Sequence, residues 1–142
     1  LTRSSAASDV YKRQDQDEAM AGEWFIRAAE QGSSRDQFTV AGMYRWGRFG
    51  ADTDVDKALY WYQKAAAQGL SHAQHSLGRI YSSGKLVKQD KRQAYLWFSL
   101  AILSGHEKAK QSLKELSDAM SQEEITESQQ QMQDLIQQAD TK

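Results

Sequence analysis

The sequence predicts an all-α protein made of repeated pairs of helices. Its 142 residues contain no proline and no cysteine, and they are rich in helix-favouring Ala, Gln, Leu, Lys and Glu. A pattern of aromatic, alanine and glycine positions recurs, with Trp24, Trp61 and Trp97 standing 37 and then 36 residues apart. Signals for helix starts and ends agree with the apolar spacing. With 39% hydrophobic residues, the chain is long enough for one domain with a core.

Residues 1–14 are set apart from the repeats. The stretch "SSAASDVYKRQ", residues 4–14, matches no helical or strand pattern. It resembles the translation of a transposon-end adapter used in sequencing libraries. We therefore expect residues 1–14 to be a non-native, adapter-derived segment, and we read the natural protein from Asp15 onward with its true beginning missing. The alternative is a native flexible tail.

The second helix of each unit carries the clearest pattern. In the middle copy, residues at spacings of 0, 3, 4, 7 and 8 form one helical face: Ala58, Trp61, Tyr62, Ala65 and Ala66. Tyr60 falls off this face and is expected at its edge. Asp54 and Asp90 suit the N-cap, where a carboxylate accepts backbone N–H bonds. Gly32, Gly69 and Gly105 can adopt the left-handed conformation that ends a helix with little conformational strain. These start and end signals predict second helices at residues 17–31, 54–68 and 90–104.

A different pattern marks the first helix of each unit. Gln37, Val40, Ala41, Tyr44 and Gly47 match Gln74, Leu77, Gly78, Tyr81 and Gly84 at a constant offset of 37. Ser34 with Gln37, and Ser71 with Gln74, have the spacing of capping boxes. We expect first helices at residues 34–46, 71–83 and 107–118.

The C-terminal segment predicts one further helix, from the capping box at Ser121 and Glu124 to about Gln138. Its apolar stripe is narrow and consists of Ile125, Met132, Leu135 and Ile136. A narrow stripe on a Gln- and Glu-rich helix is typical of a capping element with a wet outer face. The alternative is a coiled-coil arm, for which about two heptads are short.

Two stretches, "HAQHSLGRIYSSGKLVKQD" and "DKALYWYQKAAAQG", closely resemble the Sel-one-like repeat (SLR), a relative of tetratricopeptide repeats. The resemblance covers about residues 15–117, and the first full unit departs from it at Asp36 and Ala41. It implies a right-handed α-solenoid, a superhelix of antiparallel helix pairs with about seven helices. The implied units are partial at 15–32, full at 33–69 and 70–105, and partial at 106–118, followed by a capping helix and tail at 119–142.

Four groups of residues were considered as sites for chemistry. "SSGK", from Ser82 to Lys85, has the S-x-x-K spacing of penicillin-binding serine enzymes, and a few relatives are described as β-lactamase-like, so a cell-wall enzyme is the alternative function. It ends a predicted helix, however, and no S-D-N or K-T-G motif accompanies it. The other groups are the three histidines at 72, 75 and 106, the aspartates at 52, 54 and 56, and the basic residues at 85, 88, 91 and 92.

None of these groups is complete. The histidines lack further ligands, and the aspartates lack the Gly and distal Glu of a calcium loop. Charge is arranged in blocks of −4 at residues 15–34, +4 at 71–106 and −4 at 107–142, which is not a nucleic-acid footprint. No apolar run approaches the roughly 20 residues of a membrane span. We therefore expect no metal, no cofactor, no nucleic acid and no membrane span.

The function expected from the sequence is a non-enzymatic adaptor that binds a protein or peptide on the concave face of the solenoid. Trp46 is the sharpest candidate contact, since an aromatic outside the repeat's packing set can anchor a partner; its alternative role is packing on the loop at 48–53. A purely structural piece of a longer scaffold is a third possibility. The candidate contacts on the first helices are Phe38, Gly42, Arg45, Trp46, His75, Arg79, Ser82 and Ser83, and the partner, compartment and oligomeric state are left open.

Overall fold

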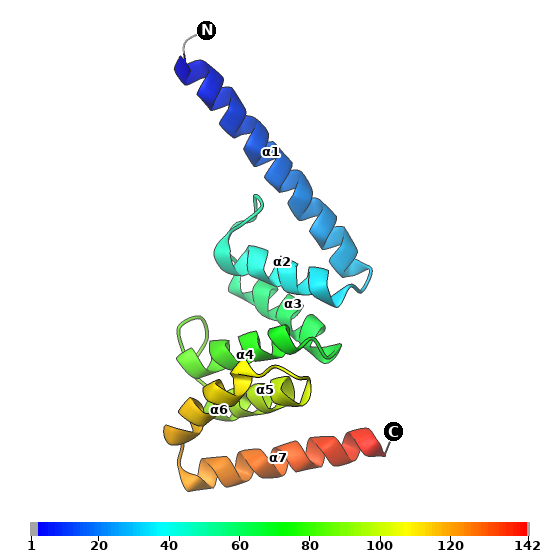
Figure 1. Cartoon of the computed structure of the whole chain (residues 1–142), viewed down its shortest axis with the longest axis vertical. Helices are drawn as coiled ribbons and strands as arrows, with labels where there is room; N and C mark the ends of the chain where they lie inside the picture. The colour runs from blue at the N-terminus through cyan, green and yellow to red at the C-terminus, as the bar shows by residue number, and fades with distance from the viewer. Residues whose placement is uncertain (1–2, 142) are drawn as a thin grey trace. The chain divides into compact units, whose positions relative to one another are not determined.

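The structure, a computed structural model, describes residues 3–141 and divides into two compact units that meet between Gln68 and Gly69. Each unit is a stack of helices joined by short turns (Figure 1). The described residues form seven helices in packed repeating pairs, as predicted. The first unit holds α1 (Arg3–Glu30), α2 (Ser34–Trp46) and α3 (Val55–Ala67), and the second holds α4 (Ser71–Ser83), α5 (Lys91–Leu103), α6 (Lys108–Asp118) and α7 (Gln122–Asp140).

Helix α1 is longer than the sequence patterns indicate. It begins at Arg3 rather than near residue 17, so the predicted start is wrong and the helix runs through residues 4–14, which carry no helical pattern in the sequence. The physical reason is that no glycine or proline interrupts the chain before Gly22, and most of the intervening residues are compatible with a helix. Every residue from Ala6 to Met20 is exposed, and only the end of α1, where Ala29 is 1% exposed, is packed into the core against α2.

The second helices begin and end where their polar and glycine residues place them. Asp54 accepts a hydrogen bond from the Lys57 backbone N–H at 3.1 Å, and Asp90 accepts one from that of Gln93 at 3.0 Å. Glycines 32, 69 and 105 have φ values of +104°, +87° and +90°, the left-handed conformation expected after a helix end. These predictions are confirmed.

The predicted capping boxes of the first helices are wrong. Helix α2 is capped by Ser33, which accepts from the Asp36 N–H at 3.3 Å, and the N-cap residue of α4 is Leu70, with no side-chain cap. Gln37 is instead buried between helices, where its amide donates to the Ala29 carbonyl at 3.1 Å and accepts from Gln68 Nε2 at 2.8 Å. A buried carbonyl without a donor is costly, so the burial of this region favours the interhelical role of Gln37. The capping box of Ser121 and Glu124 on α7 is confirmed.

Large and small side chains alternate in the core of each pair. In α3, Trp61 and Tyr62 are 9% and 3% exposed, while Ala65 and Ala66 one turn later are 0% and 3% exposed. The alanines let the neighbouring helix approach beside the aromatics. Tyr60, by contrast, is 51% exposed at the edge of this face, as predicted.

Helix α7 ends the second unit and packs mainly against α5 rather than against α6 (Figure 1). Met132 is buried in this contact, whereas Leu135 and Ile136 of the predicted apolar stripe are 45% and 43% exposed. Over residues 3–141, no helix has the length and apolar character needed to cross a membrane. The incomplete burial of α7 leaves apolar surface beside α5.

Candidate functional site

In the first unit, Trp46 is the most prominent of the candidate contacts. It is the last residue of α2 and is 61% exposed, so it is not buried under the following loop. The guanidinium carbon of Arg45 lies 4.6 Å from the centre of its ring, a cation–π contact that orients the indole. Phe38 has a different role, because its ring packs edge-on against Tyr62 with centroids 5.7 Å apart. Trp46, exposed and in contact with the partly buried Arg45, is therefore the predicted contact that the packing of this unit leaves most accessible.

In the second unit, Arg79 of α4 is exposed, whereas the side chains of His75, Ser82 and Ser83 make hydrogen bonds within the unit. The Ser83 hydroxyl donates to the Ile80 carbonyl at 3.3 Å and accepts from the Lys85 N–H at 3.4 Å, so it ends the helix. His75 is half-buried, and its Nε2 lies 2.9 Å from the hydroxyl oxygen of Ser112 on α6. The structure thus uses Ser83 and His75 within the unit.

The three histidines of the second unit lie together. The ring centroids of His75 and His106 are 4.5 Å apart, and those of His72 and His106 are 4.8 Å apart. Burial, followed by the positive charges of His106 and Arg79, lowers the pKa of His75 to about 4, and burial also lowers the pKa of His106. In the described part of the chain, no group of three His, Cys, Asp or Glu side chains is placed to hold a metal ion. The cluster is therefore a packing feature of the second unit.

The S-x-x-K sequence does not form a nucleophile site. The Ser82 hydroxyl donates to the Arg79 carbonyl at 3.2 Å, as a serine in the last turn of a helix commonly does. Gly84 then takes a left-handed φ of +67°, and Lys85 lies beyond the helix end and is exposed. A serine–lysine pair requires both side chains on consecutive turns of one helix. That arrangement is interrupted here.

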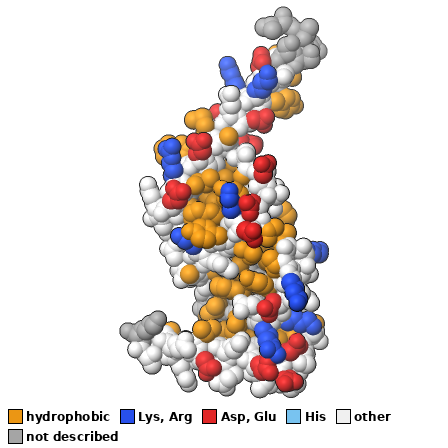
Figure 2. Space-filling model, turned by 180° about the vertical axis from the view of Figure 1, so that it is seen from behind, with side chains coloured by type: hydrophobic (Ala, Val, Ile, Leu, Met, Phe, Trp, Pro, Cys, Tyr) orange, Lys and Arg blue, Asp and Glu red, His pale blue; other side chains and the backbone are white. Residues whose placement is uncertain are grey.

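Two of the four basic residues around the loop at 84–90 contact carbonyl or carboxyl groups. Lys91 donates to the Ala119 carbonyl at 2.8 Å, and Arg92 forms an ion pair with Glu127. Together with Lys88, they line a polar depression of about 530 Å³ that also contains Asp90 and Glu124. Figure 2 shows charges of both signs gathered near this end of the second unit. Such mixed charge suits a solvated loop better than an anion site.

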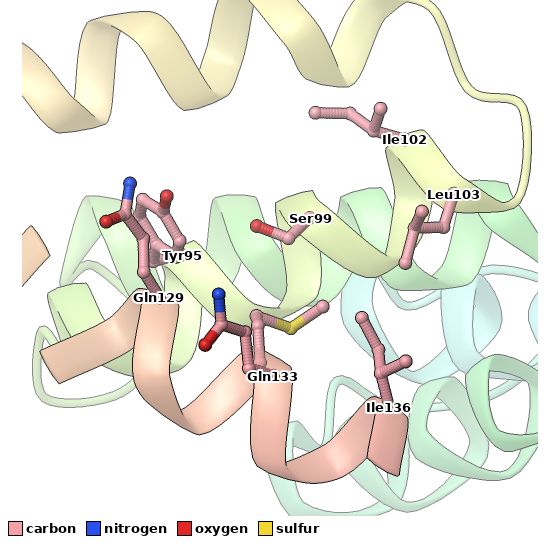
Figure 3. A pocket seen from close by; sticks show the side chains of 8 residues that line it. Tyr95, Ser99, Ile102, Leu103, Gln129, Gln133 and Ile136 are labelled. Atoms are coloured by element: carbon pink, nitrogen blue, oxygen red, sulfur yellow. The ribbon is translucent and has the colours of Figure 1, made fainter. Parts of the chain in front are cut away.

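An apolar groove lies between α5 and α7, and the sequence analysis did not find it. It has a volume of about 550 Å³ and is open to solvent. Figure 3 shows side chains from both helices lining it. The apolar stripe of α7 was visible in the sequence, but its incomplete coverage by α5 was not. The groove is lined by Tyr95, Ser99, Ile102, Leu103, Gln129, Met132, Gln133 and Ile136.

These features define a helical-repeat protein, since pairs of 13-residue helices recur, with an aspartate cap at the start of each second helix and left-handed glycines at the turns. A comparison with protein families matches the Sel1 repeat at residues 12–33, 37–70 and 71–106. The chain belongs to the Sel1-repeat family, which confirms the resemblance inferred from the sequence. No curated protein matches the chain in a sequence search.

Solved structures of the same fold are similar to this chain. One is the crystal structure of a protective antigen present in uropathogenic Escherichia coli strains, which displays an SLR fold, with 30% identity and a TM-score of 0.79 over 91% of this chain. Another is a Sel1 repeat protein from Oxalobacter formigenes, with 28% identity and a TM-score of 0.62 over 67% of this chain. The chain spans only 28% and 38% of the lengths of these two proteins.

Proposed function

We propose that the chain is a non-enzymatic adaptor that binds a protein or peptide segment through the first helices of its repeats, α2 and α4. The observation that carries this proposal is the exposed Trp46 held by Arg45 at the end of α2. Trp and Arg are enriched among residues that dominate binding energy, because they present large apolar area together with directed polar contacts. An indole oriented before binding also loses little conformational entropy when a partner arrives.

The chemistry of the polar residues supports a binding role. The Ser82 hydroxyl and the carboxylates of Asp54 and Asp90 are used to end or begin helices. A catalytic group, by contrast, is held beside a second reacting group in a cleft. Membership of a helical repeat family agrees with a protein-binding function, since stacked helix pairs present extended surfaces to partners.

The proposal is tested by selecting peptides from a random phage-display library on the immobilised chain. The dissociation constant of the best peptide is then measured for the wild type and for Trp46→Ala and Arg79→Glu. We expect Trp46→Ala to weaken binding about tenfold, which is the loss of one exposed aromatic anchor. Because the two residues belong to different units, a peptide that uses only one unit responds to only one substitution.

The matched control is Trp24→Ala. Trp24 is 67% exposed, and its ring centre lies 5.9 Å from the guanidinium carbon of Arg27. It therefore resembles Trp46 with Arg45, but it lies on α1, which is not the first helix of a repeat. It should leave binding unchanged, and all variants should melt like the wild type by circular dichroism. Equal losses for Trp24→Ala and Trp46→Ala would remove the assignment to α2. Acylation of Ser82 by a labelled penicillin would overturn the non-enzymatic part of the proposal.

A further inference from the structure

We infer that the groove between α5 and α7 is a binding site for a basic, apolar peptide segment of a partner protein. This surface shares no residue with the candidate contacts on α2 and α4, so the inference goes beyond the proposed function and stands or falls independently of it.

The groove has apolar side chains both on its buried floor and on its exposed rim. Tyr95 and Met132 form its floor and are 8% and 7% exposed. Leu103 and Ile136 form its rim at one end and are 66% and 43% exposed, respectively (Figure 3). Contiguous apolar surface of this kind marks an interaction site more often than isolated exposed side chains do.

Polar groups in the groove suit a peptide backbone. Gln129 and Gln133 stand on the α7 side (Figure 3), and each amide offers both donors and an acceptor. A peptide presents alternating N–H and C=O groups that such amides can pair with. The groove is therefore able to take apolar side chains on its floor while satisfying main-chain groups at its edge.

The ends of the helices decide the sign of the partner's charge. Tyr95 and Gln129 lie at one end of the groove and Leu103 and Ile136 at the other, so α5 and α7 run in the same direction (Figures 1 and 3). Both carbonyl ends therefore lie at the end formed by Leu103 and Ile136, where their dipoles are negative. This end attracts cations.

The formal charges add to the dipoles. Helix α7 carries five carboxylates and no Lys or Arg, and α5 has no charged residue after its first turn. Asp140 follows Ile136 by four residues, so it lies on the groove face of α7 one turn beyond the rim. The first Lys after α5 is Lys108, at the start of α6. Its charge helps to lower the pKa of His75, so Lys108 lies toward α4. By its spacing from Ile136, Asp140 thus places a negative charge on the continuation of the groove face of α7.

The same charges disfavour a second copy of this chain as the occupant. Placing one α7 on another would bring two helices together that carry only carboxylates, and like charges at a contact are destabilising. A partner with Leu or Met side chains and with Lys or Arg at one end complements both the apolar floor and the negative end.

The test uses a short fluorescein-labelled peptide in which Leu recurs every three or four positions and the other positions are Lys and Gln. Its acidic counterpart has Glu in place of each Lys. Fluorescence anisotropy should detect binding of the basic peptide and at least about tenfold weaker binding of the acidic one. Replacing both rim residues, Leu103→Ser with Ile136→Ser, should weaken the basic peptide about tenfold through lost apolar contact.

Asp140→Lys and Asp134→Lys form a matched pair that separates the groove from general attraction to an acidic helix. Both reverse one charge on α7, and neither residue lines the groove. Asp140 lies one turn beyond Ile136 on the groove face, whereas Asp134 lies off that face and accepts a hydrogen bond from Gln130 at 3.0 Å. We expect Asp140→Lys to weaken binding of the basic peptide about three- to tenfold and Asp134→Lys less than about twofold. Trp46→Ala and Arg79→Glu should have no effect.

Three results would overturn the inference. One is equal weakening by Asp134→Lys and Asp140→Lys, which would mean diffuse attraction to the helix. Another is the absence of binding to the wild type at millimolar peptide. The third is a dimer in analytical ultracentrifugation that the double rim variant dissociates, because a second copy would then occupy the groove. Circular dichroism melts of all variants establish that these losses do not come from unfolding.

Discussion

The pairs α2–α3 and α4–α5 are two copies of the same repeat, and they differ in the side chains that pack between their helices. An aromatic contact occupies the same register in both: Phe38 packs on Tyr62 with centroids 5.7 Å apart, and His75 packs on Phe98 with centroids 5.6 Å apart. The distance between the two rings is thus nearly the same, although the first pair has phenylalanine where the second has histidine. The repeat determines where a contact occurs, and the individual side chain determines its chemistry.

The small residue in the first helix of each pair differs in size as well. Ala41 in the first pair corresponds to Gly78 in the second, and Ala41 is fully buried. A Cβ atom added at Gly78 would lie only 2.4 Å from Cδ1 of Phe98, which is itself 2% exposed. The two pairs therefore reach close packing through different combinations of small and aromatic residues, so a residue that suits one copy does not suit the other.

The largest effect is expected for Gly78→Ala, which places the alanine of the first pair into the second. The new methyl group would overlap the Phe98 ring, and we expect a loss of about 1–3 kcal/mol in the free energy of unfolding, measured by urea titration. Gly42→Ala is the control, because a Cβ at Gly42 meets nothing within 4 Å. That change should stabilise α2 by about 0.5–1 kcal/mol.

A double variant sharpens this comparison. Phe98→Leu makes room for the methyl group, so Gly78→Ala should cost less in its presence than in the wild type. If the two substitutions are additive, the overlap with Phe98 is not the cause of the destabilisation.

A smaller effect is expected from pH, and it should arise in the second pair. The unfolded chain protonates His75 near pH 6.5, but the folded chain does so only near pH 4. The unfolded state therefore binds more protons in this window, and the stability contributed by neutral His75 is present above about pH 6.5 and is lost as the pH falls. Because much of the His75 side chain is exposed to solvent, which screens its charge, the full pKa shift does not appear as stability. We expect the free energy of unfolding to fall by about 1 kcal/mol.

The check is His75→Phe, which gives the second pair the residue of the first. Urea titrations at pH 7.5 and 5.0 should show a smaller difference for this variant than for the wild type. His106, His72, Arg79 and Lys108 face this position and remain in the variant, so the lowered pKa of His106 retains part of the dependence. An unchanged difference would mean that His75 does not titrate as inferred.

The smallest effect concerns the polar link in the first pair. Gln68 donates to the buried amide oxygen of Gln37, whereas the corresponding residue of the second pair is the exposed Ser104. Gln68→Ala should cost about 1 kcal/mol, because it removes a hydrogen bond from a buried acceptor. Ser104→Ala should change the melting temperature very little. Similar shifts for both would show that the link between Gln37 and Gln68 contributes nothing specific.

The fold could be predicted because its signals are local. A carboxylate at Asp54 or Asp90 and a glycine at the opposite helix end act within a few residues, so the helix bounds agree with the sequence to within one or two residues. The failures have a different origin. Gln37 has the spacing of a capping residue, but tertiary burial gives it another partner, Ala29. The exposed start of α1 shows that residues with no amphipathic pattern can still continue a helix.

The candidate site was less accessible to sequence reasoning. The pattern identified Trp46 as lying outside the packing set, and its exposure agrees with that interpretation. It also marked His75, whose engagement with Ser112 depends on α6, an element distant in the sequence. The groove between α5 and α7 depends on how α7 packs against α5, an element distant in the sequence, which no local signal reports.

The glycines that follow the second helices have a consequence for how such genes change. At positions 32, 69 and 105 the backbone is left-handed, and a Cβ there would meet no atom within 4 Å. A duplication or deletion of DNA whose ends fall at two of these codons would rejoin equivalent turns in the same reading frame. Such an event would add or remove 36 or 37 residues and keep a glycine at the turn, while it would bring together helix pairs whose packing residues differ.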